Sequence, residues 1–133
     1  MLTSIHAANF GPIGPRPIDI ELSKVTVLVG ANASGKSTVL RAPAILAQTA
    51  AAPDRVGIVH DGERVLFASY EDLCFRRDPG VGVELGVGIS IDSRRAQRYA
   101  RKRYGPELPS TAEPLRLSYV CTASREERRW SVR

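Results

Sequence analysis

The stretch GANASGKST, residues Gly30 to Thr38, decides the fold of this 133-residue chain. It matches the pattern Gly-x-x-x-x-Gly-Lys-Ser/Thr in full, and it directly follows the apolar, β-branched run VTVLV at residues 25–29. The residues from Gly35 to 52 have helical composition. A strand, a glycine loop and a helix in this order can bind phosphate, because backbone N–H groups of the loop and the helix N-terminus point at the anion. The pattern therefore predicts a phosphate loop.

Each residue of this loop has an expected role. Lys36 would reach the β- and γ-phosphates of a nucleotide, the hydroxyl of Ser37 would bind Mg²⁺, and Thr38 would lie near the α-phosphate. The expected ligands are ATP and Mg²⁺. The alternative is a chance match in a glycine-rich turn, with Lys36 as an ordinary surface lysine. The predicted nucleotide-binding residues are Gly30, Asn32, Ala33, Ser34, Gly35, Lys36, Ser37 and Thr38.

Composition places the chain among ordinary globular proteins of one domain, with 43% hydrophobic and 25% charged residues. It has no apolar run of about 18 residues and no basic-then-apolar leader, so we expect a cytoplasmic protein without membrane contact. Cys74 and Cys121 lack CxxC or histidine-rich company, which favours two free thiols. The net charge of +5 is compatible with a nucleic-acid partner, or with a coding preference for arginine and a missing acidic remainder.

Alternating apolar residues predict several strands around the loop. Residues 25–29 are apolar enough for a strand that is covered on both faces. The helix after the loop should present Val39, Leu40, Ala44, Leu46 and Ala47 on one apolar stripe, and Pro43 should bend it or end it early. The other predicted strands are residues 3–10 with Ile5 and Ala7 on one face, 18–22 with Ile18, Ile20 and Leu22 on one face, 81–91, 115–123 and 127–133.

The remaining segments carry weaker signals. Asp61 and Gly62 form a turn signal between two short apolar runs, which suggests a hairpin or a strand followed by a loop. Residues 69–75 fit a short helix or an irregular loop. Residues 93–105 are basic and compatible with a helix, and residues 105–114 form a proline-rich surface connection.

The residues IHAANFGPIGPRPIDIEL (5–22) and VTVLVGANASGKSTVLRA (25–42) resemble the N-terminal opening of the RecF, OLD and SMC group of ABC-type ATPases. Asn32 is part of the likeness, which takes the form GxNxSGKS. The stretch FASYEDLCFRRDP (67–79) is similar to a segment of OLD-like bacterial AAA-family ATPases. Two departures are Ala33, where glycine is common, and Pro43, which interrupts a usually continuous helix.

The resemblance implies an α/β fold of the P-loop NTPase class. Residues 1–133 would be the N-terminal lobe of an ABC-type ATPase domain, incomplete by itself. Residues 1–52 would supply strands, the phosphate loop and the first helix. Residues 53–133 would form a mixed, largely antiparallel β-rich half. The group also implies a Walker B strand ending in Asp-Glu, an LSGGQ-like signature and a switch histidine, and none of these is visible in the sequence.

Substitutes for the missing catalytic groups are few. Asp61 and Glu63 follow an apolar run and could imitate the end of a Walker B strand, although a plain hairpin turn explains them better. Gln48 could sense the γ-phosphate, although a solvated residue of the loop's own helix is the simpler interpretation. His6 and His60 are isolated, which is more typical of strand-face or turn histidines than of a catalytic base. No catalytic residue is identified.

Two hypotheses follow. In the first, the chain binds ATP as part of an ABC-type ATPase that hydrolyses it once Walker B and signature motifs complete the site. A second ATPase head, DNA or a nuclease would then be partners. In the second, the chain is a non-enzymatic, nucleotide-dependent interaction module that a separately encoded partner completes. A small-molecule kinase would need an acceptor site and a lid, and residues 94–103 could imitate the lid, although a solvated basic helix is the simpler interpretation.

Overall fold

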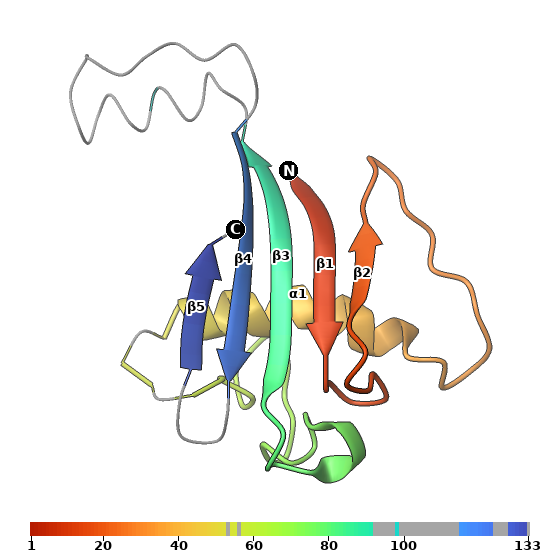
Figure 1. Cartoon of the computed structure of the whole chain (residues 1–133), viewed down its shortest axis with the longest axis vertical. Coiled ribbons are helices and arrows are strands. Elements are labelled where there is room, and N and C mark those ends of the chain that lie inside the picture. Colours follow the sequence, from red (N-terminus) through yellow and green to blue (C-terminus); the bar gives the residue numbers. More distant parts are fainter. Residues whose placement is uncertain (53, 56, 92–97, 99–114, 124–127, 133) are drawn as a thin grey trace.

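The computed structural model describes residues 1–52, 54–55, 57–91, 98, 115–123 and 128–132. In this part of the chain, five strands form one sheet in the order β2-β1-β3-β4-β5, with every neighbouring pair antiparallel. Helix α1 covers one face of the sheet (Figure 1). The elements are β1 (Leu2–Ala8), β2 (Ile18–Glu21), α1 (Lys36–Ala50), the 3₁₀ turn η1 (Phe75–Arg77), β3 (Val83–Ile91), β4 (Leu115–Ala123) and β5 (Arg128–Val132).

The core lies between α1 and the sheet, where the sequence alternation predicted it. Ile5 and Ala7 of β1 are buried on the helix-covered face, and Ile18 and Ile20 of β2 pack against the same core. Ile5 lies between Ile20 of β2 and Val87 of β3 in the sheet register. The strands predicted at 3–10, 18–22, 81–91 and 115–123 all exist, with ends within two residues of the prediction, and the described part of 127–133 is strand β5.

Helix α1 begins at Lys36, inside the glycine loop as expected, but it runs unbroken through Pro43 to Ala50. Of the two outcomes predicted at Pro43, a bend or an early end, the early end does not occur. Proline removes one backbone bond, whereas burial of an apolar face against the sheet stabilises the whole helix. The predicted stripe also needs correction, because Leu40 is 63% exposed while Ile45 is fully buried.

Residues 25–29 are not a strand, and this prediction is wrong. Val25, Val27 and Val29 are 81%, 75% and 90% exposed, and only Leu28 of this run packs against the core. The segment runs outside the edge strand β2 on its way to α1 (Figure 1). A β-branched sequence favours an extended backbone, but a strand also needs a neighbour to pair with. Within the described residues, no strand pairs with it.

The Asp61–Gly62 turn is a hairpin turn, as predicted. Phe67 donates its N–H to His60 at 2.8 Å, and Gly62 donates to Val65 at 3.2 Å. The segment after it forms turns and η1, in agreement with the predicted irregular loop. The predicted helix at 93–105 and connection at 105–114 lie outside the described residues, apart from residue 98.

Candidate functional site

The phosphate-loop residues surround a cavity of about 230 Å³ at the start of α1. Seven of the eight predicted site residues line it, and Gly30 does not. Pro12 completes the wall and was missed by the sequence analysis, because its contact comes from a distant turn. The cavity is lined by Pro12, Asn32, Ala33, Ser34, Gly35, Lys36, Ser37 and Thr38.

The Lys36 side chain folds back and makes hydrogen bonds to its own loop. Its ammonium donates to the carbonyl oxygens of Gly30 at 2.8 Å and Ala31 at 2.6 Å, and it lies 3.4 Å from the hydroxyl of Ser34. A Cβ on Gly30 would lie 2.8 Å from the Ser34 hydroxyl, so the Ser34 side chain would have to shift. Gly30 therefore shapes the loop and accepts from the lysine, without lining the cavity.

The backbone of the loop is left-handed at two positions. Gly35, with φ of 91°, is the N-cap of α1, and Ala33 has φ of 63°. Glycine tolerates this region, whereas alanine is strained there. The first helical bond runs from the N–H of Val39 to the carbonyl of Gly35 at 3.0 Å. The N–H groups of the first helical turn before Val39 consequently have no acceptor within the helix, which makes this end suited to an anion.

The turn from Asn9 to Gly14 packs directly against the loop. A Cβ on Gly11, where φ is 54°, would lie 3.1 Å from Cγ2 of Thr38, and one on Gly35 would lie 3.3 Å from Pro12. The turn is closed by bonds from Asn9 N to Gly14 O and from Phe10 N to Ile13 O, both 2.9 Å. The turn and the phosphate loop, which are about twenty residues apart in the sequence, thus form one wall of the cavity.

Gln48 is neither solvated nor near the phosphate loop. It is buried, and its side chain binds the backbone of Val59 and Val65 in the hairpin. It lies twelve residues along α1 from Lys36, a rise of about 18 Å. Both sequence interpretations of Gln48 are therefore wrong, because the partners of its amide come from a segment beyond the helix.

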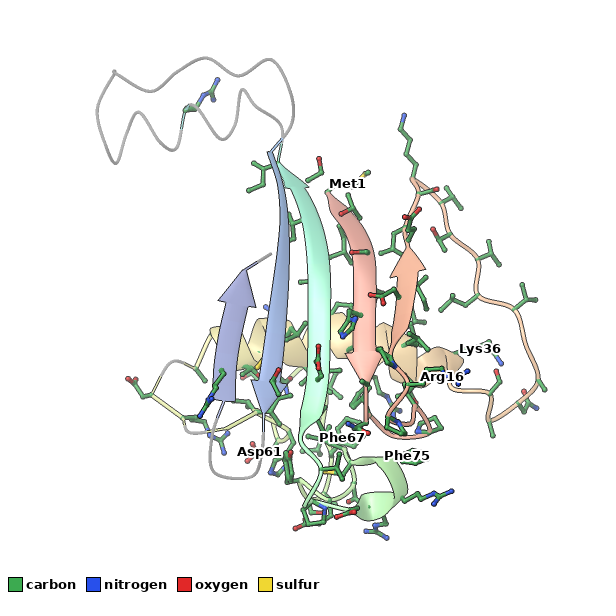
Figure 2. The ribbon with its side chains drawn as sticks, viewed as in Figure 1. Met1, Arg16, Lys36, Asp61, Phe67 and Phe75 are labelled. Carbon is green, nitrogen blue, oxygen red and sulfur yellow. The ribbon has the colours of Figure 1, made fainter. Side chains whose placement is uncertain are left out.

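The candidate Walker B substitute is also distant from the loop. A Cβ on Gly62 would lie 2.6 Å from the Gln48 side chain, which places the turn at the far end of α1. Asp61 makes two bonds to Arg55, at 2.7 and 3.1 Å, and this pairing lowers the pKa of Asp61 and raises that of Arg55. Figure 2 shows Asp61 and Lys36 at opposite sides of the molecule. Asp61 therefore belongs to a hairpin turn.

The two histidines are structural, as expected. His6 on β1 bridges Asp19 of β2 at 2.8 Å and Glu84 of β3 at 3.0 Å. Alternation along β1 places it on the face opposite Ile5 and Ala7, away from α1. His60 lies 3.3 Å from the carbonyl of Phe67 in the hairpin. Cys74 and Cys121 are buried and form no disulfide with each other, and burial raises the pKa of Cys74.

A family and a solved structure relate the chain to known proteins. Residues 25–104 match the family described as "AAA domain, putative AbiEii toxin, Type IV TA system". A solved structure from work on the structural biochemistry of ATP-driven dimerization and DNA-stimulated activation of SMC ATPases superposes with a TM-score of 0.60 at 18% identity, covering 98% of this chain and 68% of that chain. No curated protein gives a significant match. The predicted P-loop NTPase fold is confirmed.

The described residues contain no helix that is long and apolar enough to cross a membrane.

Proposed function

The chain belongs to this AAA domain family of nucleotide-binding ATPases, and we propose on this basis that it binds ATP with Mg²⁺ through residues Gly30 to Thr38. The observation that carries the proposal is the cavity at the start of α1, which the motif residues line almost alone. Its donors suit a polyphosphate, because they combine an ammonium, several hydroxyls and the N–H groups of a helix N-terminus.

Lys36 has the central role in this proposal. Its ammonium is at present satisfied by two carbonyl oxygens and one hydroxyl of its own loop. Phosphate oxygens would replace these acceptors with negatively charged ones, which form stronger bonds to an ammonium. Ser37 is exposed one residue into the helix, where its hydroxyl would bind Mg²⁺, while Asn32, Ala33, Ser34, Gly35 and Thr38 would surround the phosphates. Gly30 would keep the loop in shape.

Hydrolysis needs a group that positions or activates the attacking water, and we propose that this group comes from outside the lobe formed by residues 1–133. The acidic candidate Asp61 is paired with Arg55 at the far end of α1. ATP binding and hydrolysis would therefore be separate properties, with hydrolysis requiring the Walker B and signature motifs that the sequence lacks. A second ATPase head could supply the signature motif.

The exposed valines before the loop support this need for completion. Val25, Val27 and Val29 present apolar side chains to solvent beside the candidate site, on a segment with no strand partner among the described residues. An added strand would bury these side chains and pair their backbone. Further segments of the same polypeptide would make an ATPase, whereas a separately encoded partner would make a nucleotide-dependent interaction module. The reading frame that continues or adjoins this sequence distinguishes the two.

Partners of the completed protein follow from the same proposal. The solved structure of similar fold belongs to work on ATP-driven dimerization and DNA-stimulated activation. We propose that ATP also joins two heads here, and that DNA or a nuclease is the third component. The net charge of +5 is compatible with a polyanion.

Titration of the purified chain with Mg²⁺-ATP, followed by calorimetry, tests the phosphate-loop assignment. Lys36→Ala should weaken binding at least tenfold, and Ser37→Ala should remove the dependence on Mg²⁺. Lys24→Ala is the matched control, because Lys24 is an exposed lysine of the segment that leads to the loop. Binding that is unchanged in Lys36→Ala would refute the assignment. Steady-state hydrolysis by the chain alone would refute the separation of binding from hydrolysis.

A further inference from the structure

A second cavity lies against the same turn that contacts the phosphate loop. Its volume is about 200 Å³, enough for one heterocyclic base but not for a chain of nucleotides. Its lining combines an aromatic ring, a guanidinium and a carboxylate. The lining residues are Asn9, Pro15, Phe75, Arg76, Asp78 and Val81.

The turn from Asn9 to Gly14 connects the two cavities. Gly11 contacts Thr38 of the phosphate loop, and Gly14 contacts the ring of Phe75, where a Cβ would lie 3.4 to 3.6 Å from three ring atoms. Gly11 and Gly14 are three residues apart, so their Cα atoms are separated by at most about 11 Å. Because this is an upper limit, the two cavities are close enough for the phosphates and the base of one nucleotide to reach both. In Figure 2, Arg16 is drawn between Lys36 and Phe75.

The chemistry of the second cavity suits a base better than a phosphate. The guanidinium of Arg76 lies over the Phe75 ring, 5.2 Å from its centroid, and so offers a flat, cationic surface for stacking. The Asp78 carboxylate, which accepts from the N–H of Gly80 at 2.9 Å, can also accept from an amino group of a base. The same carboxylate repels phosphate. A polyphosphate or a nucleic-acid backbone is therefore disfavoured at this position.

The backbone here is held in a strained conformation. Arg76 and Arg77 have φ of 55° and 59°, in the left-handed region that side chains other than glycine rarely adopt. The strain is maintained by bonds from Phe75 N to Asn9 O at 3.0 Å and from Arg77 N to Cys74 O at 3.0 Å. Such conformations gather at ligand sites, where they fix a side chain in place. The strained residue Arg76 is the one that covers Phe75.

We propose that this cavity binds the base of the nucleotide whose phosphates lie on residues 30–38, with Arg76 stacked between the base and Phe75. Asp78 would accept from an exocyclic amino group, which adenine carries and uracil and thymine lack. The inference rests on the proposed function, because it needs phosphates in the first cavity. It assigns the selection of ATP over other polyphosphates to the turn at Phe75–Arg77.

Calorimetry with two ligands tests the proposed base pocket. The ligands are Mg²⁺-ATP and Mg²⁺-tripolyphosphate, and the second lacks the base. Arg76→Ala should weaken the affinity for ATP about tenfold and leave the affinity for tripolyphosphate unchanged. Arg76→Gly should do the same while relieving the strain at φ 55°, so that unfolding cannot account for the loss. Arg77→Ala is the matched control, because Arg77 has the same backbone conformation but pairs with Asp72 at 2.5 Å. It should bind both ligands as the unchanged chain does.

The outcomes separate the two proposals. Lys36→Ala should weaken the binding of both ligands, since it removes an ammonium that would contact the phosphates of either one. If the Arg76 variants bind ATP as tightly as the unchanged chain, the base pocket is wrong while the phosphate loop stands. If they keep ATP affinity but lose affinity for single-stranded DNA, the cavity serves a nucleic acid instead. If the unchanged chain binds neither ATP nor tripolyphosphate, both proposals are wrong.

Discussion

The side-chain amide of Gln48 donates to the carbonyl of Val59 at 2.5 Å, and this contact ties the end of helix α1 to the hairpin beside it. The same amide donates to the carbonyl of Val65 and accepts from its N–H, both at 3.1 Å. One buried side chain thus satisfies backbone groups on both arms of the hairpin. The arrangement works because Gly62 leaves room for the amide.

Replacing Gln48 by leucine should lower the free energy of unfolding by about 3 kcal/mol, because it leaves buried backbone groups without partners. Urea denaturation measures this. Leu40→Ala is the control on the same helix, and since Leu40 is 63% exposed it should cost less than about 1 kcal/mol. A Gln48→Leu variant as stable as the original chain would show that the hairpin does not depend on the amide.

Ala33→Gly should raise the free energy of unfolding by about 1 kcal/mol, since Ala33 has φ of 63° and glycine adopts this conformation without strain. Thermal unfolding at a fixed scan rate measures the change. Ala31→Gly in the same loop is the control, because Ala31 is not among the residues with positive φ. There the added freedom of the unfolded chain should make glycine destabilising. Equal effects at both positions would contradict this account.

Gly11→Ala should weaken ATP binding, on the function proposed above. Its Cβ would lie 3.1 Å from Cγ2 of Thr38 on a backbone with φ of 54°, so the turn and the phosphate loop must move apart. Combining it with Thr38→Ser should restore part of the affinity, because serine keeps the hydroxyl and removes Cγ2. We expect a loss of about tenfold for the single variant. No rescue in the double variant would mean that backbone strain alone is responsible.

Stability should fall at alkaline pH because of Tyr70. Burial raises the pKa of Tyr70 to about 12 from an ordinary value of 10.0. Between these values the unfolded chain loses the phenolic proton while the folded chain keeps it. The contribution of neutral Tyr70 is therefore complete below pH 10.0 and is lost as the pH rises toward about 12. Urea denaturation at several alkaline pH values should show a smaller decline in Tyr70→Phe than in the original chain.

Local patterns predicted much of this fold. Alternation placed Ile5, Ala7, Ile18 and Ile20 on the face that packs against the core, because side chains of a strand point to opposite sides in turn. The glycine motif placed the start of α1 at Lys36, because its spacing encodes a loop and a helix terminus together. Seven of the eight residues chosen from the motif line one cavity.

Features that depend on distant partners were not predictable in this way. The β-branched run at 25–29 has a local preference for extended backbone, but pairing depends on a neighbour that the pattern does not encode. Gln48 looked solvated because its partners lie in a hairpin whose position the helix sequence does not specify. Pro12 was missed for a similar reason, since a turn near the N-terminus reaches the phosphate loop only in the folded chain.

The exposed valines at positions 25, 27 and 29 also bear on how this protein behaves at high concentration. An extended apolar segment with an unpaired backbone can add to the same segment of another molecule, as edge strands do. Such association is second order in protein, so the lifetime of the monomer shortens in proportion as the concentration rises. A partner or segment that covers residues 25–29 would therefore also keep the protein from associating with itself.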